Sequence, residues 1–243
     1  MQKLRLTLLL ILGIFQISTA CDDILSECSE ALESEVELLT GLPNEQELRR
    51  ICPVFLDVFD CVREKSLKCE GKTAEQAVVS SDDPGDAIAA QLFINMEALA
   101  KEICNEESDL RKSYIRTQPC TREYFSKPPK IQCKREAEAA YAAYRDMNEI
   151  LLAEGEEELD EDAMCLMEAY AFACIAHDLQ LTCNEEARNV LTGIFQRLKL
   201  SRVSCSVSSL NELKTNFLES LDLEPERRDV FSLAFNSLKK RKK

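Results

Sequence analysis

Residues 52–69 read CPVFLDVFDCVREKSLKC, a run in which eight and then seven residues separate three cysteines. A second run, CLMEAYAFACIAHDLQLTC at residues 165–183, repeats the pattern with eight residues in each gap. Apolar residues recur at helical spacing in both runs. In a helix, such cysteines lie about 12 Å apart along the axis, which is too far for a disulfide between them. Each cysteine of these two helices is therefore expected to pair with another segment.

The chain has twelve cysteines, and all of them follow residue 20. An even number in an oxidising compartment predicts six disulfides. The sequence contains one histidine and no C-x-x-C pair, whereas structural zinc sites combine such pairs with further cysteines or histidines. We therefore predict no metal site and no other cofactor. The cysteines that we expect to be bonded are Cys21, Cys28, Cys52, Cys61, Cys69, Cys104, Cys120, Cys133, Cys165, Cys174, Cys183 and Cys205.

Residues 1–20 have the features of a secretory signal peptide. Lys3 and Arg5 precede an apolar run over residues 6–15, and Ser-Thr-Ala at residues 18–20 provides small residues for cleavage. We expect the mature chain to begin at Cys21 and to be secreted. The apolar run is too short to span a bilayer, and no later stretch approaches ~20 uncharged apolar residues, so we predict no membrane span.

The charge of the chain argues against two classes of partner. The formal net charge of the 243 residues is −14. Without the signal peptide, 28 basic residues face 44 acidic ones, which leaves −16. Nucleic acid and anionic membranes carry the same sign of charge, so neither is expected as the main partner.

The overall pattern predicts an all-α, disulfide-braced bundle of about eight helices, because helical periodicity runs through nearly every segment and strand alternation is not seen. The cysteines fall into two sets of six with a similar order of gaps, which suggests duplicated halves at residues 21–118 and 119–243. A linker is expected within residues 121–131, which contain Pro128 and Pro129. The alternative is one continuous bundle whose helices happen to have similar lengths.

Individual residues predict where helices begin and end. Asn44 with Glu47 forms a capping-box pattern at the start of the helix that contains the first triplet. Pro53 lies inside that helix and predicts a kink or a fresh helical start. Residues 82–85, Asp-Asp-Pro-Gly, are expected to form a loop, after which Asp86 caps the next helix.

Disulfide pairing follows from hairpin geometry, because residues at equal distances from the turn of an antiparallel pair face each other. With a turn near residue 78, this rule pairs Cys52 with Cys104, and with a turn near residue 184 it pairs Cys165 with Cys205. A turn at Gly41 and the analogy between the halves supply the other pairs. The predicted pairs are Cys52–Cys104, Cys165–Cys205, Cys21–Cys61, Cys120–Cys174, Cys28–Cys69 and Cys133–Cys183.

His177 is the one histidine of the chain, and Cys174-Ile-Ala-His177-Asp178 resembles the C-x-x-H-D motif of secreted phospholipases A2. That family also needs a cysteine directly before Cys174, where this chain has Ala173, and a glycine-rich calcium loop. Any Ser-His-Asp or Cys-His site would depend on the same histidine. We therefore predict no catalytic residue, and keep a phospholipase-like lipid hydrolase as an alternative.

Two charged runs have structural explanations. The acidic run at residues 154–162 lacks the ligand order of an EF-hand, and carboxylates before a helix are favoured by its dipole. The basic end at residues 239–243 could contact an acidic surface or polymer, but a soluble helix end explains it equally well.

A longer pattern consists of Cys52, Cys61, Cys69, Cys104, Leu110, Arg111, Tyr114, Ile115 and Cys120. It resembles the pattern of a family of arthropod secreted helical proteins, those similar to the twenty-seven-kilodalton haemolymph glycoprotein of insects. The resemblance implies a secreted, disulfide-bonded protein of haemolymph or another body fluid.

These observations favour a secreted, non-enzymatic extracellular protein with a binding or interaction role toward an unknown protein partner. The alternative is a carrier of a small apolar ligand, since helices held by disulfides can enclose a cavity. An apolar pocket of about 300 Å³ or more would favour the carrier.

Overall fold

The computed structural model describes residues 24–126, 130–147, 161–200, 205, 209, 211 and 213–237. Every regular element in these ranges is a helix, which confirms the predicted all-α class. The chain divides into two compact units, Met1–Arg122 and Glu123–Lys243, which are described separately below. A duplication that relates them remains a prediction.

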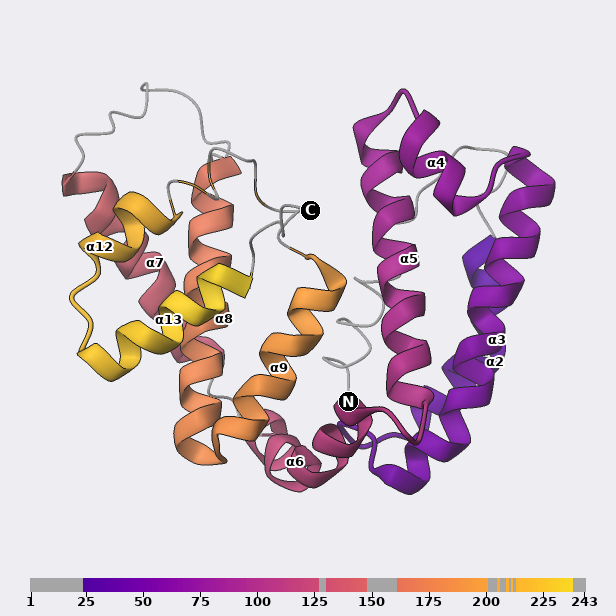
Figure 1. Ribbon diagram of the computed structural model, residues 1–243, viewed down its shortest axis with the longest axis horizontal. Coiled ribbons are helices and arrows are strands. Elements are labelled where there is room, and N and C mark those ends of the chain that lie inside the picture. The colour runs from indigo at the N-terminus through magenta and orange to yellow at the C-terminus, as the bar shows by residue number, and fades with distance from the viewer. Residues whose placement is uncertain are drawn as a thin grey trace. The chain divides into compact units, whose positions relative to one another are not determined.

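In the first unit, α2 packs along α3, α3 packs against α5, and α4 lies across the beginning of α5 (Figure 1). Disulfides join α2 to α3 and α3 to the end of α5. The helices of this unit are α2 (Ile24–Glu37), α3 (Glu45–Glu70), α4 (Ala74–Ser80), α5 (Pro84–Cys104) and most of α6 (Asp109–Ser126).

Helix α3 begins and ends at residues with clear capping geometry. The Asn44 side chain accepts a hydrogen bond from the Glu47 backbone N–H at 2.9 Å, and the Glu47 carboxylate accepts one from the Asn44 N–H at 2.8 Å, as the capping box predicts. Gly71 ends the helix in the left-handed region at φ 68°. The expected fresh start at Pro53 is wrong, because α3 runs through this residue as one helix. Pro53 is exposed, whereas the neighbouring Cys52 is buried and bonded to Cys104.

The segment between α3 and α5 differs from the sequence-based expectation. Residues 74–80 form α4, whose Thr73 cap makes a second capping box with Gln76. Helix α5 begins at Pro84, and Asp83 rather than Asp86 is its cap. Proline is favoured at the first helical position because its missing N–H would have no partner there. The predicted loop at residues 82–85 is therefore wrong in its second half.

Helix α6 covers the first part of the predicted linker, because it continues through Pro119 to Ser126. Residues 127–129 lie outside the described part of the chain, and α7 follows at once. Tyr124, in the last turn of α6, belongs to the second unit and is buried there in a cluster with Leu179 and Ala187. Burial of an aromatic ring therefore keeps this segment helical where its composition suggested a linker.

The residues of the family-like pattern at the start of α6 are structural. Tyr114 is buried and donates a hydrogen bond to the carbonyl oxygen of Pro43 at 2.8 Å, which joins α6 to the turn between α2 and α3. Arg111 is only 2% exposed and donates to the carbonyl oxygen of Ile103 at 3.0 Å. Leu110 is buried beside it. Tyr114 and Arg111 thus donate to backbone carbonyls, that of Pro43 in a turn and that of Ile103 at the end of α5, and Leu110 adds buried apolar surface; these roles are a sufficient reason for the three residue types.

In the second unit, α8 packs against α7, α9 and α13 (Figure 1). The buried side chains of α8 are apolar and lie around much of the helix, as expected of a helix that packs against several others. Asn184 caps α9, and Pro225 begins α13. Ser209 and Asn211 are helical, and the segment continues as a π-helix, η1, and then as a short α12. The elements are α7 (Lys130–Met147), α8 (Glu161–Thr182), α9 (Glu185–Leu198), η1 (Leu213–Phe217), α12 (Leu218–Ser220) and α13 (Pro225–Ser237).

Four disulfides are described, and two of them confirm predicted pairs, Cys52–Cys104 and Cys165–Cys205. The other two are Cys28–Cys61 and Cys133–Cys174. Cys69, Cys120 and Cys183 are also disulfide-bonded, and Cys21 lies outside the described residues. The pairs that these findings contradict are Cys21–Cys61, Cys28–Cys69, Cys120–Cys174 and Cys133–Cys183.

The error in the pairing has a geometric cause. Cys28 lies nine residues before the end of α2 at Glu37, whereas Cys61 lies sixteen residues after the start of α3 at Glu45. The two helices are therefore offset by about two turns along their axes. A rule that centres the hairpin on its turn cannot detect such an offset, because helix packing sets it.

Candidate functional site

The first unit contains a cavity of about 510 Å³ between α2, α3, α4 and α5. Ligand pockets in proteins typically have volumes of about 300–1,000 Å³. In Figure 1, α3 and α5 run lengthwise and α4 crosses near the end of α3 and the beginning of α5. Side chains from these helices and from α2 line the cavity. The cavity is therefore large enough for a small molecule.

The deep part of the cavity is apolar. Phe59 lies between Phe55 and Phe93, with ring centroids 5.2 Å and 5.4 Å away. The rim includes exposed side chains such as Leu67 and Lys72, so the cavity opens to solvent. Its buried apolar lining residues are Leu32, Val58, Phe59, Ala90 and Phe93.

The sequence identified one wall of this cavity but not the cavity itself. Apolar residues recur at helical spacing in the first cysteine run, and three of them, Phe55, Val58 and Val62, line the space. A further wall comes from α4, which composition did not reveal. The Thr73-x-x-Gln76 capping pattern before a short apolar stretch was the available signal. The disulfide Cys28–Cys61 ties α2 to α3 directly before Val62.

Arg63 joins three of the helices that surround the cavity. Its Nε and Nη2 donate to Glu97 Oε2 on α5 at 2.8 Å and 2.5 Å. Its Nη1 and Nη2 also donate to the Glu75 carboxylate on α4 at 3.2 Å and 2.9 Å. The guanidinium lies over the Phe93 ring at 5.7 Å from the centroid. Lys101 completes the group with a 2.6 Å contact to Glu97.

This ionic group is charge-balanced and depends on pH. The hydrogen bonds from Arg63 lower the pKa of Glu75 from 4.5 to about 2. Burial acts to raise the pKa of Glu97, but the hydrogen bonds from Arg63 and Lys101 outweigh it and lower that pKa. Because both folded-state pKa values are depressed, this contribution to stability is present above pH ~4.5 and is lost as the pH falls toward 2.

Replacing Arg63 by methionine is expected to lower the free energy of unfolding of the first unit by about 2 kcal/mol, because the Glu97 carboxylate is only 5% exposed and would keep Lys101 alone. The matched control is Arg49→Met, because the Arg49 side chain is 59% exposed. This substitution should lower the free energy of unfolding by less than ~1 kcal/mol. Hydrogen exchange of the α3 and α5 amides measures both. Equal effects of the two variants would contradict the structural role of Arg63.

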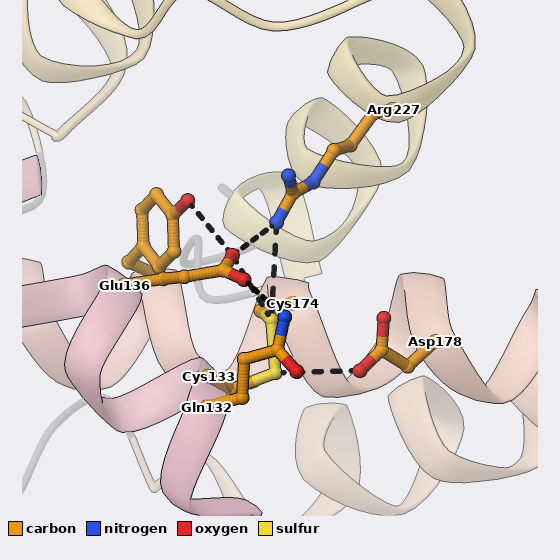
Figure 2. Close-up of a disulfide and its surroundings, with 7 residues drawn as sticks. Gln132, Cys133, Glu136, Cys174, Asp178 and Arg227 are labelled. Carbon is orange, nitrogen blue, oxygen red and sulfur yellow. Dashed lines mark hydrogen bonds and ion pairs between the residues drawn. A yellow bond between two sulfur atoms is a disulfide. The ribbon is translucent and has the colours of Figure 1, made fainter. Parts of the chain in front are cut away.

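The second unit contains a cluster of charged side chains and a disulfide near His177. Figure 2 shows the disulfide between Cys133 of α7 and Cys174 of α8, with the Glu136 carboxylate between it and Arg227. Arg227 Nη2 lies 2.6 Å from Glu136 Oε2, and an Asp178 oxygen lies 3.6 Å from the Cys133 sulfur. The arrangement is a covalent brace with an ion pair beside it.

His177 itself is half-buried on α8. Burial and the positive charge of Arg227 lower its pKa, although the charge of Asp178 opposes this. Burial raises the pKa of Asp178. Cys174 is bonded to α7, and Ala173, where the phospholipases have a second cysteine, is fully buried. No feature around His177 adds support to the lipid-hydrolase alternative.

A metal is a poor fit to this cluster. The sulfur atoms of Cys133 and Cys174 and a carboxylate oxygen of Asp178 lie within 4.8 Å of one another. Sulfur binds metals as thiolate, and these two sulfurs are bonded to each other. Of these three groups, only the Asp178 carboxylate is then a ligand of the kind that a cation needs, and the nearby Glu136 carboxylate is paired with Arg227.

The two charged runs contribute little to the described structure. The last two residues of the acidic run, 161–162, begin α8. Residues 154–160 and the basic end at residues 239–243 lie outside the described part of the chain. Within the described residues, no helix is long and apolar enough to cross a membrane.

Comparisons with protein-family models, with curated proteins and with solved structures found no match for this chain. Its function must therefore be argued from its own residues. Of the two features described above, the cavity of the first unit offers space for a ligand. The His177 cluster in the second unit is filled by a disulfide and an ion pair.

Proposed function

We propose that this chain is a secreted, non-enzymatic protein that binds and carries a small, largely apolar ligand in the cavity of its first unit. The supporting observation is the cavity, with a volume of about 510 Å³ and an apolar interior. It exceeds the size of about 300 Å³ that favours a carrier. Four described disulfides are consistent with secretion, and the resemblance to arthropod haemolymph proteins suggests a body fluid as the location.

The shape and rigidity of the cavity support a small molecule as the ligand. The apolar interior lies below a polar rim, which is the usual arrangement of a small-molecule site. The Cys28–Cys61 disulfide and the Arg63 ion pairs hold the surrounding helices before any ligand arrives. Such preorganisation reduces the entropy lost on binding.

Apolar burial predicts how affinity depends on the ligand. Each methylene group that leaves water contributes about 0.8 kcal/mol. The dissociation constants of a series of linear alcohols should therefore fall by up to about four-fold per added carbon until the chain fills the cavity. Displacement of the neutral fluorescent probe N-phenyl-naphthylamine measures this series, and native mass spectrometry of the purified protein detects any ligand that co-purifies.

A pair of variants on α4 locates the site. Ala77 lines the cavity, whereas Val79 on the same helix is 86% exposed and does not. Ala77→Trp should weaken probe binding at least ten-fold because the indole occupies the cavity, and Val79→Trp should bind like the parent. Thermal unfolding verifies that both variants are folded. Undiminished binding by folded Ala77→Trp would place the ligand elsewhere, and a parent that binds no probe would favour the alternative, an unknown extracellular protein partner.

A further inference from the structure

The charges around the mouth of the cavity fall into compensated and uncompensated groups. Arg63 and Lys101 balance Glu75 and Glu97, and Glu64 pairs with Lys68 at 2.5 Å. The remaining charged side chains that line the cavity carry a net charge of −2. These are Asp60, Glu70, Asp86 and Lys72.

Glu70 and Asp86 approach the mouth from the last turn of α3 and the first turn of α5. Both side chains are half-buried, and the Ser81 hydroxyl donates a hydrogen bond to Asp86 at 3.4 Å. Burial raises the pKa of Glu70, and the negative charge of Asp86 raises it further, while Lys72 opposes them. Two carboxylates that repel each other in a partly buried place are stabilised by a cation between them.

An anionic head group would find no comparable partner in this cavity. The guanidinium of Arg63 already donates to Glu75 and Glu97, so it has little capacity left for a ligand carboxylate. Lys72 lines the rim as an exposed side chain and interacts with Glu70. The electrostatic potential at the mouth therefore repels anions and attracts cations.

We propose that the cavity selects amphiphiles with a cationic head, such as a protonated primary amine, on an apolar body, and that Glu70 and Asp86 receive the head. This inference rests on the proposed carrier function. The apolar part enters between α3 and α5, and the ammonium group stays at the partly solvated mouth. The ligand therefore has its charge opposite to that of a fatty acid.

Three ligands with the same chain test the head group. Dodecylamine, dodecanol and dodecanoate compete with N-phenyl-naphthylamine at neutral pH and low salt, below the concentrations at which they form micelles, on the oxidised mature protein. We expect dodecylamine to bind roughly ten-fold or more tightly than dodecanoate, with dodecanol between them, and added salt to narrow the difference.

Two double variants separate local from overall charge. Glu70→Gln with Asp86→Asn should abolish the preference for dodecylamine. The control, Asp57→Asn with Asp82→Asn, removes the same amount of charge from exposed positions outside the cavity. This control variant should keep the preference for dodecylamine. The charge selection would be overturned if the parent preferred dodecanoate, or if the Glu70→Gln with Asp86→Asn variant kept the preference for dodecylamine. Either result would leave the carrier function standing. If none of the three ligands displaced the probe, the carrier function itself would fail.

Discussion

Full reduction of the mature protein is expected to unfold or greatly loosen both units. The bonds Cys52–Cys104 and Cys165–Cys205 join residues 52 and 40 positions apart, and the chain-entropy relation assigns about 4 kcal/mol to each. A domain is stable by about 5–15 kcal/mol in total, so the loss of two or more bonds per unit removes most of that reserve. The chain lacks Trp and is only 6% aromatic, which limits what its cores supply without the bonds.

Calorimetry of the oxidised protein and of the reduced, alkylated protein measures this effect, with circular dichroism to follow the helices. Oxidised protein treated with the alkylating agent alone is the control. The bonds are distributed over both units, so two double variants measure the loss of stability in each unit separately. Cys52→Ala with Cys104→Ala removes a bond from the first unit, and Cys165→Ala with Cys205→Ala removes one from the second. A fully reduced protein that kept its thermal midpoint would show that the bonds do not stabilise the fold.

Phe231→Ala is expected to destabilise the second unit by about 3–5 kcal/mol, since it leaves a cavity in a close-packed core. Phe231 on α13 is fully buried, and its ring contacts Tyr170 of α8 edge to face at 5.0 Å and Phe235 at 5.9 Å. The Arg227 guanidinium also lies 5.3 Å from its centroid. Removing the ring therefore loses contacts with both helices.

The matched control is Leu233→Ala, two residues away on the same helix and 54% exposed, which should change stability by no more than about 0.5 kcal/mol. Calorimetric melting of both variants compares them, and hydrogen exchange of the α8 amides shows whether the effect reaches the neighbouring helix. A Phe231→Ala protein as stable as Leu233→Ala would contradict the packing of α13 against α8.

Local signals in the sequence were sufficient for several elements. The capping residues Asn44 and Asn184 begin α3 and α9 because a side-chain oxygen satisfies a backbone N–H within one turn. Pro225 begins α13 for an equally local reason. Two disulfides could also be predicted, because hairpin symmetry places Cys52 near Cys104 whatever the rest of the chain does.

The sequence by itself thus determined the all-α class, the starts of α3, α9 and α13, and two of the bonds, since these depend on residues within a turn or on a simple hairpin. Packing alone decided the offset that joins Cys28 to Cys61, the helix that continues through Pro119, and the contact of Arg63 with Glu97, which lie 34 positions apart. The cavity belongs to this second group. It exists because four helices meet without filling the space between them, and no local pattern records the volume that side chains leave empty.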